Sequence, residues 1–171
     1  MATPNAIHNE IIFHLIGAFY PYYFEYRIFG DNMSLVYKGE HTNFEHFELA
    51  PCSKYTQKEI DSLNVIVPDF MLFAKDGYKF NKSKARVAGQ PLLVIEVWSS
   101  GNTKDERTRK KYLYSTSKLT EHWYISQTSD EMECYIGNIK IENQHLTKSV
   151  KTNFGLELNL NALALGNRSL K

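Results

Sequence analysis

The sequence has few cysteines and no long uninterrupted apolar run, and both absences narrow the class of protein. Its 171 residues include only Cys52 and Cys134, which do not have the close spacing of a metal-binding pair. We therefore expect two reduced thiols in an intracellular, cytoplasmic protein rather than a disulfide framework. The most apolar stretch, residues 11–24, contains His14 and is interrupted by Pro21, so it predicts neither a signal peptide nor a membrane span.

The sequence also has little net charge, but its charged residues are unevenly distributed along the chain. The formal net charge is +1, with 43% hydrophobic and 23% charged residues, as is usual for a globular protein. Residues 79–118 contain ten Lys or Arg against three acidic residues, a net charge of +7, which leaves −6 for the rest of the chain. This basic segment is typical of a nucleic-acid-binding surface, and equally of a solvated loop and helix.

The order of the predicted elements indicates an α/β protein. Apolar residues recur every four positions along residues 5–20, which predicts a helix. Alternating residues on either side of the Gly-Asp-Asn sequence at residues 30–32 predict a hairpin. A second helix is expected over residues 103–118, with Thr103 as its N-terminal cap. Strands occupy much of the remainder, so we expect one domain, residues 1–171, with a mixed β-sheet flanked by helices.

An acidic residue lies within the most apolar strand candidate. Residues 91–98 are mostly Leu, Ile and Val, yet they include Glu96. Burial of an ionised carboxylate is unfavourable unless a partner or a metal compensates it. Asp69 follows Pro68 in a second apolar strand, residues 64–74, which the proline kinks or ends. If the two strands are neighbours, both carboxylates converge at one end of the sheet.

Two converging carboxylates and a lysine would suit phosphodiester chemistry. Mg²⁺ is normally held by one or two carboxylates, with water and substrate phosphate completing the shell, so Asp69 and Glu96 could bind it. Lys110 shares a helical face with Glu106 and Tyr114, and this face can return toward the acids. A metal would lower the pKa of bound water, while the lysine would neutralise developing negative charge.

Each of these residues also has a simpler interpretation. An aspartate after a proline can be a turn former, as Asp69 would then be. Glu96 can form a buried ion pair with Arg86 or Arg109. Lys110 can be an ordinary lysine on a helix surface. Taken singly, the residues leave these alternatives open.

Together the residues resemble the motif of a known family. The segments PDF and IEVWSS, followed by Lys110 and EHW, are similar without gaps to the Uma-two family of endonucleases in the PD-(D/E)XK nuclease superfamily. The resemblance implies a restriction-endonuclease-like core, a DNA substrate, and Mg²⁺ or Mn²⁺ bound by Asp69 and Glu96. It implies the backbone carbonyl of Val97 as a further ligand. Trp98 stands where most of the superfamily has its lysine, and Lys110 matches the lysine that this family places on the helix.

The resemblance also suggests additional site residues. Glu10, on the first predicted helix, is a candidate for a helix glutamate that assists metal binding in some superfamily members. Glu106 stands where the family usually has Asp, and Tyr114 is a packing residue that could also hydrogen-bond the site. Basic residues of the 79–118 segment are expected to hold DNA phosphates: Lys79, Lys82, Lys84, Arg86, Arg107 and Lys111.

We therefore expect a Mg²⁺-dependent DNA endonuclease that hydrolyses phosphodiester bonds with metal-activated water. Cleavage of both strands would favour a homodimer. The departures from the family pattern and the small overall charge favour one alternative: a catalytically inactive, nuclease-derived module that binds nucleic acid or protein. A weaker alternative is a two-carboxylate hydrolase that acts on another substrate, such as a sugar. No feature of the sequence indicates a recognition sequence or a preference for single- or double-stranded DNA.

Overall fold

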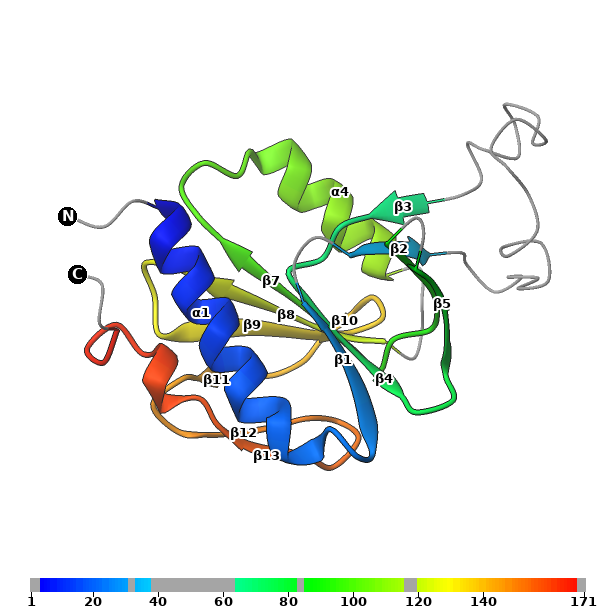
Figure 1. Ribbon diagram of the computed structural model, residues 1–171. Coiled ribbons are helices and arrows are strands. Elements are labelled where there is room, and N and C mark those ends of the chain that lie inside the picture. Colours follow the sequence, from blue (N-terminus) through cyan, green and yellow to red (C-terminus); the bar gives the residue numbers. More distant parts are fainter. Residues whose placement is uncertain (1–3, 31–32, 38–63, 83–84, 116–119, 169–171) are drawn as a thin grey trace.

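The computed structural model describes residues 4–30, 33–37, 64–82, 85–115 and 120–168 (Figure 1). Its helices are α1 (Pro4–Phe19) and α4 (Lys104–Ser115), with the short 3-10 helices η1 (Tyr20–Tyr22) and η4 (Asn161–Leu163). Both predicted helices are thus confirmed. None of the helices in these ranges has the length and apolar character needed to cross a membrane.

A seven-stranded mixed sheet forms the centre of the described structure. Its order is β1 (Tyr26–Gly30), β4 (Phe70–Ala74), β7 (Leu93–Trp98), β8 (Glu121–Ser126), β9 (Glu131–Ile136) and β10 (Ile139–Lys140). Strand β11 (Gln144–His145) also pairs with β9. The pair β7–β8 is parallel and the other pairs are antiparallel. The expected mixed sheet flanked by helices is therefore confirmed.

A smaller sheet lies beside the large one. Its order is β3 (Asn64–Ile66), β2 (Ser34–Tyr37), β6 (Arg86–Gly89) and β5 (Tyr78–Asn81). The strands β12 (Ser149–Lys151) and β13 (Glu157–Asn159) form a separate antiparallel pair. The apolar run predicted over residues 64–74 is ended at Pro68, because β3 belongs to the small sheet and β4 to the large one.

The hairpin predicted around residues 30–32 is wrong. Both of its strands exist, but β1 pairs with β4 in the large sheet, whereas β2 pairs with β3 and β6 in the small sheet. Alternating side chains identify a strand without identifying its partner, and here the chain passes from one sheet to the other between β1 and β2.

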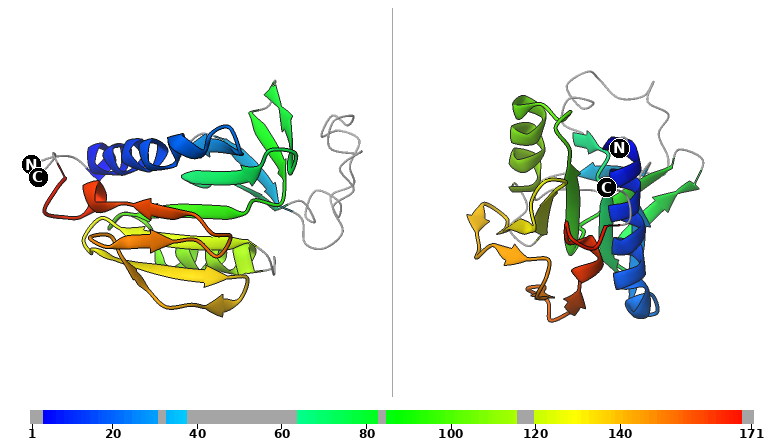
Figure 2. Two further views of the ribbon diagram at one scale, coloured as in Figure 1. Left: turned by 90° about the horizontal axis from the view of Figure 1, so that it is seen from below. Right: turned by 90° about the vertical axis from the view of Figure 1, so that its left-hand side faces the viewer.

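The two longer helices cover opposite faces of the large sheet (Figures 1 and 2). Leu93, Ile95 and Val97 of β7 belong to the apolar cluster that includes α1. Val94 and Trp98 of the same strand belong to the cluster that includes α4. Because side chains alternate along a strand, Glu96 faces α4.

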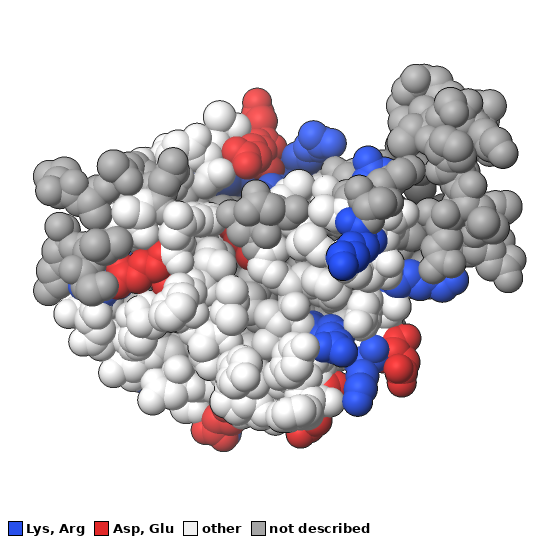
Figure 3. All heavy atoms as spheres, viewed as in Figure 1, with Lys and Arg blue, Asp and Glu red and all other residues white. Residues whose placement is uncertain are grey.

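The surface over α1 carries few charges. In the view of Figure 3, Lys and Arg residues gather mainly toward the side of the smaller sheet, while the area over α1 is largely uncharged. Residues 4–22 include one charged residue, Glu10.

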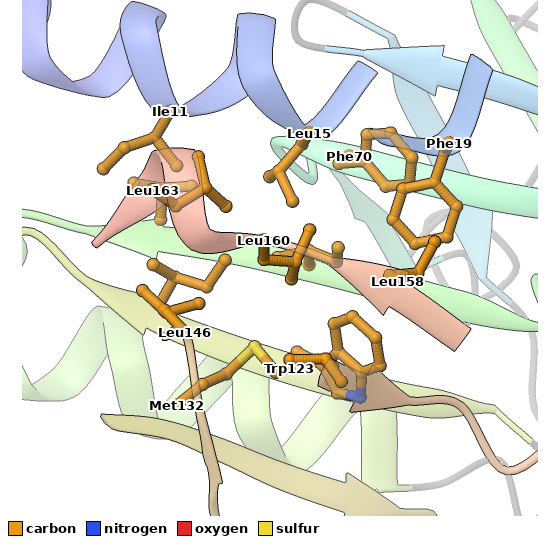
Figure 4. Close-up of a cluster of buried hydrophobic side chains, with 14 of the residues drawn as sticks. Ile11, Leu15, Phe19, Phe70, Trp123, Met132, Leu146, Leu158, Leu160 and Leu163 are labelled. Carbon is orange, nitrogen blue, oxygen red and sulfur yellow. The ribbon is translucent and has the colours of Figure 1, made fainter. Parts of the chain in front are cut away.

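The core on the α1 side explains the position of that helix. Ile11, Leu15 and Phe19 point from α1 toward η4, β13 and the sheet (Figure 4), and all three side chains are fully buried. Burial of each such side chain contributes about 1.5–3 kcal/mol. Cys134 of β9 lies in the same cluster as a free thiol, and burial raises its pKa to about 12. The expectation for Cys52 lies outside the described residues.

Helix α4 begins at the cap that its sequence predicts. The hydroxyl Oγ1 of Thr103 accepts a hydrogen bond from the backbone N–H of Glu106 at 3.2 Å. The Glu106 carboxylate in turn accepts a hydrogen bond from the Asn102 side-chain amide at 3.2 Å. These contacts fix the start of α4 directly after β7 and so determine which helix residues reach the sheet.

Candidate active site

The strand register brings Asp69 and Glu96 together. In the antiparallel pair β4–β7, Phe70 is opposite Ile95, so the next position sets Asp69 opposite Glu96 and the following one sets Pro68 opposite Val97. Proline has no N–H and cannot continue the ladder. The side chain of Asp69 replaces it: Oδ2 accepts the backbone N–H of Val97 at 2.6 Å. The two carboxylates were expected to converge if these strands were neighbours, and β4 and β7 are neighbours.

The Glu96 side chain is buried and is held by two residues of α4. Its side chain is only 1% exposed, and its two carboxylate oxygens accept different donors. Lys110 donates from Nζ to Oε2 at 2.7 Å, and Tyr114 donates its hydroxyl to Oε1 at 2.5 Å. Lys110 Nζ also donates to the carbonyl of Val67 at 3.3 Å. The basic partner of Glu96 is therefore Lys110, not Arg86 or Arg109.

This environment shifts the proton affinity of all three groups. Burial, and secondarily the charge of Asp69, raise the pKa of Glu96 to about 8, although Lys110 and Tyr114 oppose the shift. Burial lowers the pKa of Lys110, but the facing Glu96 carboxylate, with smaller contributions from Asp69 and Glu106, raises it, and the pKa stays above its usual value. Burial also raises the pKa of Tyr114 well above its usual value. Strongly perturbed groups that contact one another are characteristic of functional sites.

Helix α1 contributes His8, for which the sequence predicts a surface or pocket-lining role but no contact with Asp69. Its Nε2 lies 3.4 Å from Oδ1 of Asp69. The signal was available: His8 is four residues before Ile12 and seven before Leu15, so it is a polar residue on the inner, apolar stripe of the helix. Glu10, the candidate for a helix glutamate that assists metal binding, lies 3.9 Å from His14 on its own helix.

The predicted basic residues are distributed over separate parts of the fold. Lys79 and Arg86 lie on β5 and β6 of the small sheet, Lys82 directly follows β5, and Lys84 is outside the described residues. Arg107 and Lys111 lie on α4 but turn toward the large sheet. Arg107 donates to the carbonyl of Ser99 at 2.6 Å.

Lys111 is enclosed by aromatic rings and an acid. Its Nζ lies 5.0 Å from the ring centre of Trp98, 4.9 Å from that of Tyr124 and 5.2 Å from that of Tyr135. It also donates to Oε2 of Glu133 at 2.6 Å. Lys111 is adjacent to Lys110 in the sequence, but it contacts a different set of side chains in the interface between α4 and the sheet.

A hollow of about 540 Å³ adjoins Lys110 on its solvent side. Ile66 and Val67 form its apolar wall, together with Leu113 of α4. Asp105, Glu106 and Arg109 supply charged groups at the same hollow. Its size is within the range of small-molecule sites in proteins.

The donor set at Asp69 and Glu96 fits a divalent cation that prefers oxygen. Two carboxylates from neighbouring strands lie close enough for the charge of one to raise the pKa of the other. The β4–β7 register, continued two positions beyond the pair Phe70–Ile95, puts Val97 opposite Pro68, which has no N–H to donate to the Val97 carbonyl. Within the described residues, no group of three or more His, Cys, Asp or Glu side chains is arranged to hold a metal. A bound ion would therefore need water and substrate oxygens to complete its coordination.

Comparison with known proteins identifies the family of this chain. The model of the Uma2 family, described as "Putative restriction endonuclease", matches residues 1–166. A crystal structure described as "a putative nuclease belonging to DUF820" from Anabaena variabilis ATCC 29413 matches the fold with a TM-score of 0.58 and 15% sequence identity. The match covers 95% of this chain and 80% of that one. A search of curated proteins found no match. The family match spans nearly the whole sequence, so this chain belongs to the Uma2 family.

Proposed function

We propose that the protein is a metal-dependent endonuclease that hydrolyses phosphodiester bonds in DNA. One observation carries the proposal: two carboxylates from adjacent strands converge, and a lysine from the following helix contacts one of them at 2.7 Å. Membership of a family described as restriction endonucleases supports the reaction class. A phosphodiester suits such a combination of acids and a cationic side chain, because negative charge develops on its phosphoryl oxygens during hydrolysis.

Asp69, Glu96 and the carbonyl of Val97 are the groups that would hold Mg²⁺ or Mn²⁺. When bound, the ion supplies a Lewis acid for a phosphoryl oxygen and lowers the pKa of a coordinated water. The Val97 N–H fixes the rotamer of Asp69, and the Tyr114 hydroxyl fixes that of Glu96. These hydrogen bonds leave each carboxylate with further lone pairs for a ligand.

Lys110 carries the positive charge of the site on the solvent side. Its ammonium contacts Glu96, and Lys110 also lines the hollow that could receive substrate. There it would neutralise negative charge that develops on the phosphoryl oxygens as water attacks phosphorus and the bond to the leaving oxygen breaks. His8 adds a hydrogen-bonding group at Asp69 from the other side.

The test is cleavage of supercoiled plasmid and of single-stranded DNA in Mg²⁺ or Mn²⁺. Removal of a charge-stabilising group typically lowers kcat by about 10²–10³-fold, and we expect such losses for Glu96→Gln and Lys110→Met. Lys104→Met, an exposed change on the same helix, is the matched control and should cleave like wild type. Cleavage that persists in both site variants would refute the proposal.

A catalytically inactive binding module is the second candidate. The observation that favours it is that both oxygens of Glu96 are already occupied by Lys110 and Tyr114. It predicts that wild type leaves DNA intact at every metal concentration. Gel-shift measurements would then show equal DNA binding by wild type, Glu96→Gln and Lys110→Met.

A further inference from the structure

The hollow beside Lys110 combines apolar and charged groups directly next to the candidate site. It is formed by the end of β3 and by α4, and its volume is about 540 Å³. Lys110, which contacts Glu96, is one of its lining residues. Pockets of about 300–1,000 Å³ typically hold one small molecule. The hollow therefore has room for one nucleotide, but not for the stacked base pairs of a duplex.

The apolar wall of the hollow suits the face of a base or a sugar. Val67 and Leu113 are part of this wall, and the Val67 side chain is 43% exposed. In duplex DNA the base faces are covered by their neighbours, so a protein meets phosphates, sugars and base edges. An unpaired nucleotide instead presents the face of its base, which can pack against side chains. The exposed wall thus favours an unpaired nucleotide.

The charges of the hollow do not favour the backbone of a duplex. Its two cations, Arg109 and Lys110, are matched by two acids, Asp105 and Glu106, so the lining carries no net positive charge. Proteins that follow a nucleic-acid backbone use positively charged grooves. A phosphate is therefore expected at a single cation rather than along the whole hollow.

Arg109 is the basic residue of the hollow that is available for this phosphate. Arg107 and Lys111 of the same helix donate to a backbone carbonyl and to an acid of the sheet. Lys110 is paired with Glu96. Arg109 is exposed, and the hydrogen bonds and ion pairs among the described residues do not involve its guanidinium. A guanidinium can bind two oxygens of one phosphate at the same time.

We propose that the hollow binds one unpaired nucleotide of the DNA strand, with its phosphate on Arg109 and its base or sugar against Val67 and Leu113. The inference rests on the proposed function, because it takes the polymer to be DNA. It adds the substrate class, which is a strand that is unpaired next to the bond to be cut. Lys110 then serves the phosphate that is cleaved, and Arg109 holds a neighbouring phosphate of the same strand.

Fluorescence anisotropy of a labelled single-stranded oligonucleotide, measured in chelator, tests this subsite without requiring cleavage. Wild type should bind the strand about tenfold or more tightly than the same strand annealed to its complement. Arg109→Met should raise the dissociation constant by about tenfold. It should also lower the slope of log affinity against log salt concentration by about 0.7, as expected for the loss of one phosphate contact with a single strand. Arg109→Lys keeps the charge and should keep the slope of wild type.

Two exposed positions outside the hollow provide matched controls. Lys104→Met removes a charge from the same helix and should leave the affinity and the salt slope unchanged. Val67→Ser should weaken binding by about threefold or more, without a change in slope, because it removes apolar contact area. Ile139→Ser on β10 is the same kind of change at a side chain that is 65% exposed, and it should bind like wild type.

The subsite and the proposed catalysis fail in different ways. Equal affinity of wild type for the single strand and the duplex would overturn the subsite. An Arg109→Met variant with the affinity and salt slope of wild type would overturn it as well. A single strand that binds as expected but stays uncut in Mg²⁺ and Mn²⁺ would support the subsite and refute the endonuclease.

Discussion

Tyr114 and Lys110 hold Glu96 from one helix, and the tyrosine hydroxyl can be removed without changing charge. Tyr114→Phe leaves one oxygen of a buried carboxylate without its donor, so we expect a loss of about 1–3 kcal/mol in the free energy of unfolding. Urea denaturation measures this loss. The matched control is Tyr112→Phe on the exposed face of α4, which should be neutral. Equal stabilities for the two variants would contradict the hydrogen bond.

Glu96 also makes stability depend on pH. Its pKa is about 8 in the folded protein against an ordinary 4.5. Between these values the folded state keeps a proton that the unfolded chain releases, so the free energy of unfolding falls as pH rises. His122 acts in the opposite direction, because burial lowers its pKa from 6.5 to about 4 and stability is lost as pH falls through that range. Between pH 6.5 and 8, the pH dependence of the free energy of unfolding is therefore expected to come from Glu96 rather than from His122.

We predict that metal-free wild type loses stability between pH 6.5 and 8, and that Glu96→Gln flattens this slope. The amide of the glutamine cannot ionise, so residue 96 neither binds nor releases a proton over that interval. Urea unfolding in chelator at several pH values provides the measurement. A variant with the same slope as wild type would show that another group titrates there.

The residue scale is also where the sequence was most informative about the site. Asp69 and Glu96 stood out because a carboxylate in an apolar strand is rare, and Lys110 because helix spacing relates it to Tyr114. The contact of His8 with Asp69 was not predicted, because it depends on how α1 lies across the sheet. Local patterns report which face a side chain occupies, but not what packs against that face.

At the scale of elements, α4 is fixed to the sheet by Lys111 as well as by the site. We expect Lys111→Ala to lower the free energy of unfolding by about 1–2 kcal/mol, because its ammonium contacts three aromatic rings and the carboxylate of Glu133. Lys104→Ala, exposed on the same helix, serves as control and should be neutral. Chemical denaturation of the two variants gives the comparison. A difference within experimental error would mean that apolar packing alone holds α4.

Helices were predicted more fully than strand partners. The signals that predict a helix are local in the sequence. Both α1 and α4 show a helical periodicity of residue types, and the cap of α4 at Thr103 lies next to its first turn. The pairing of β1 with β4 joins segments about forty residues apart and leaves no local trace. The predicted hairpin failed for this reason, while the end of β3 before Pro68 could be read directly from the proline.

At the scale of the whole molecule, metal binding should appear as added stability. A ligand that binds only the folded state stabilises it by RT ln(1 + [L]/Kd), or about 2.7 kcal/mol at a hundred times Kd. We therefore expect Mg²⁺ or Mn²⁺ to raise the Tm of wild type, and Asp69→Asn and Glu96→Gln to abolish the rise. Differential scanning calorimetry with and without chelator tests this. Equal shifts in all three proteins would place the metal elsewhere.

The charge distribution shows what the sequence could not predict at this scale. Residues 79–118 are strongly basic as a segment, but the fold divides them between the small sheet and α4. Arg107 and Lys111 are engaged by Ser99 and Glu133 rather than pointing freely into solvent. A cluster in sequence is therefore not a single patch in space, and the phosphate contacts proposed for these residues need separate tests.

The join between the two sheets has a mechanical consequence. Only Val67, Pro68 and Asp69 separate the last residue of β3 from the first of β4. Lys110 donates hydrogen bonds to the carbonyl of Val67 and to the carboxylate of Glu96. A change in the tilt of the small sheet would therefore displace Asp69 through the chain and Lys110 through its hydrogen bond to the Val67 carbonyl. The three residues that join the sheets therefore connect the position of the small sheet to the distances among Asp69, Glu96 and Lys110.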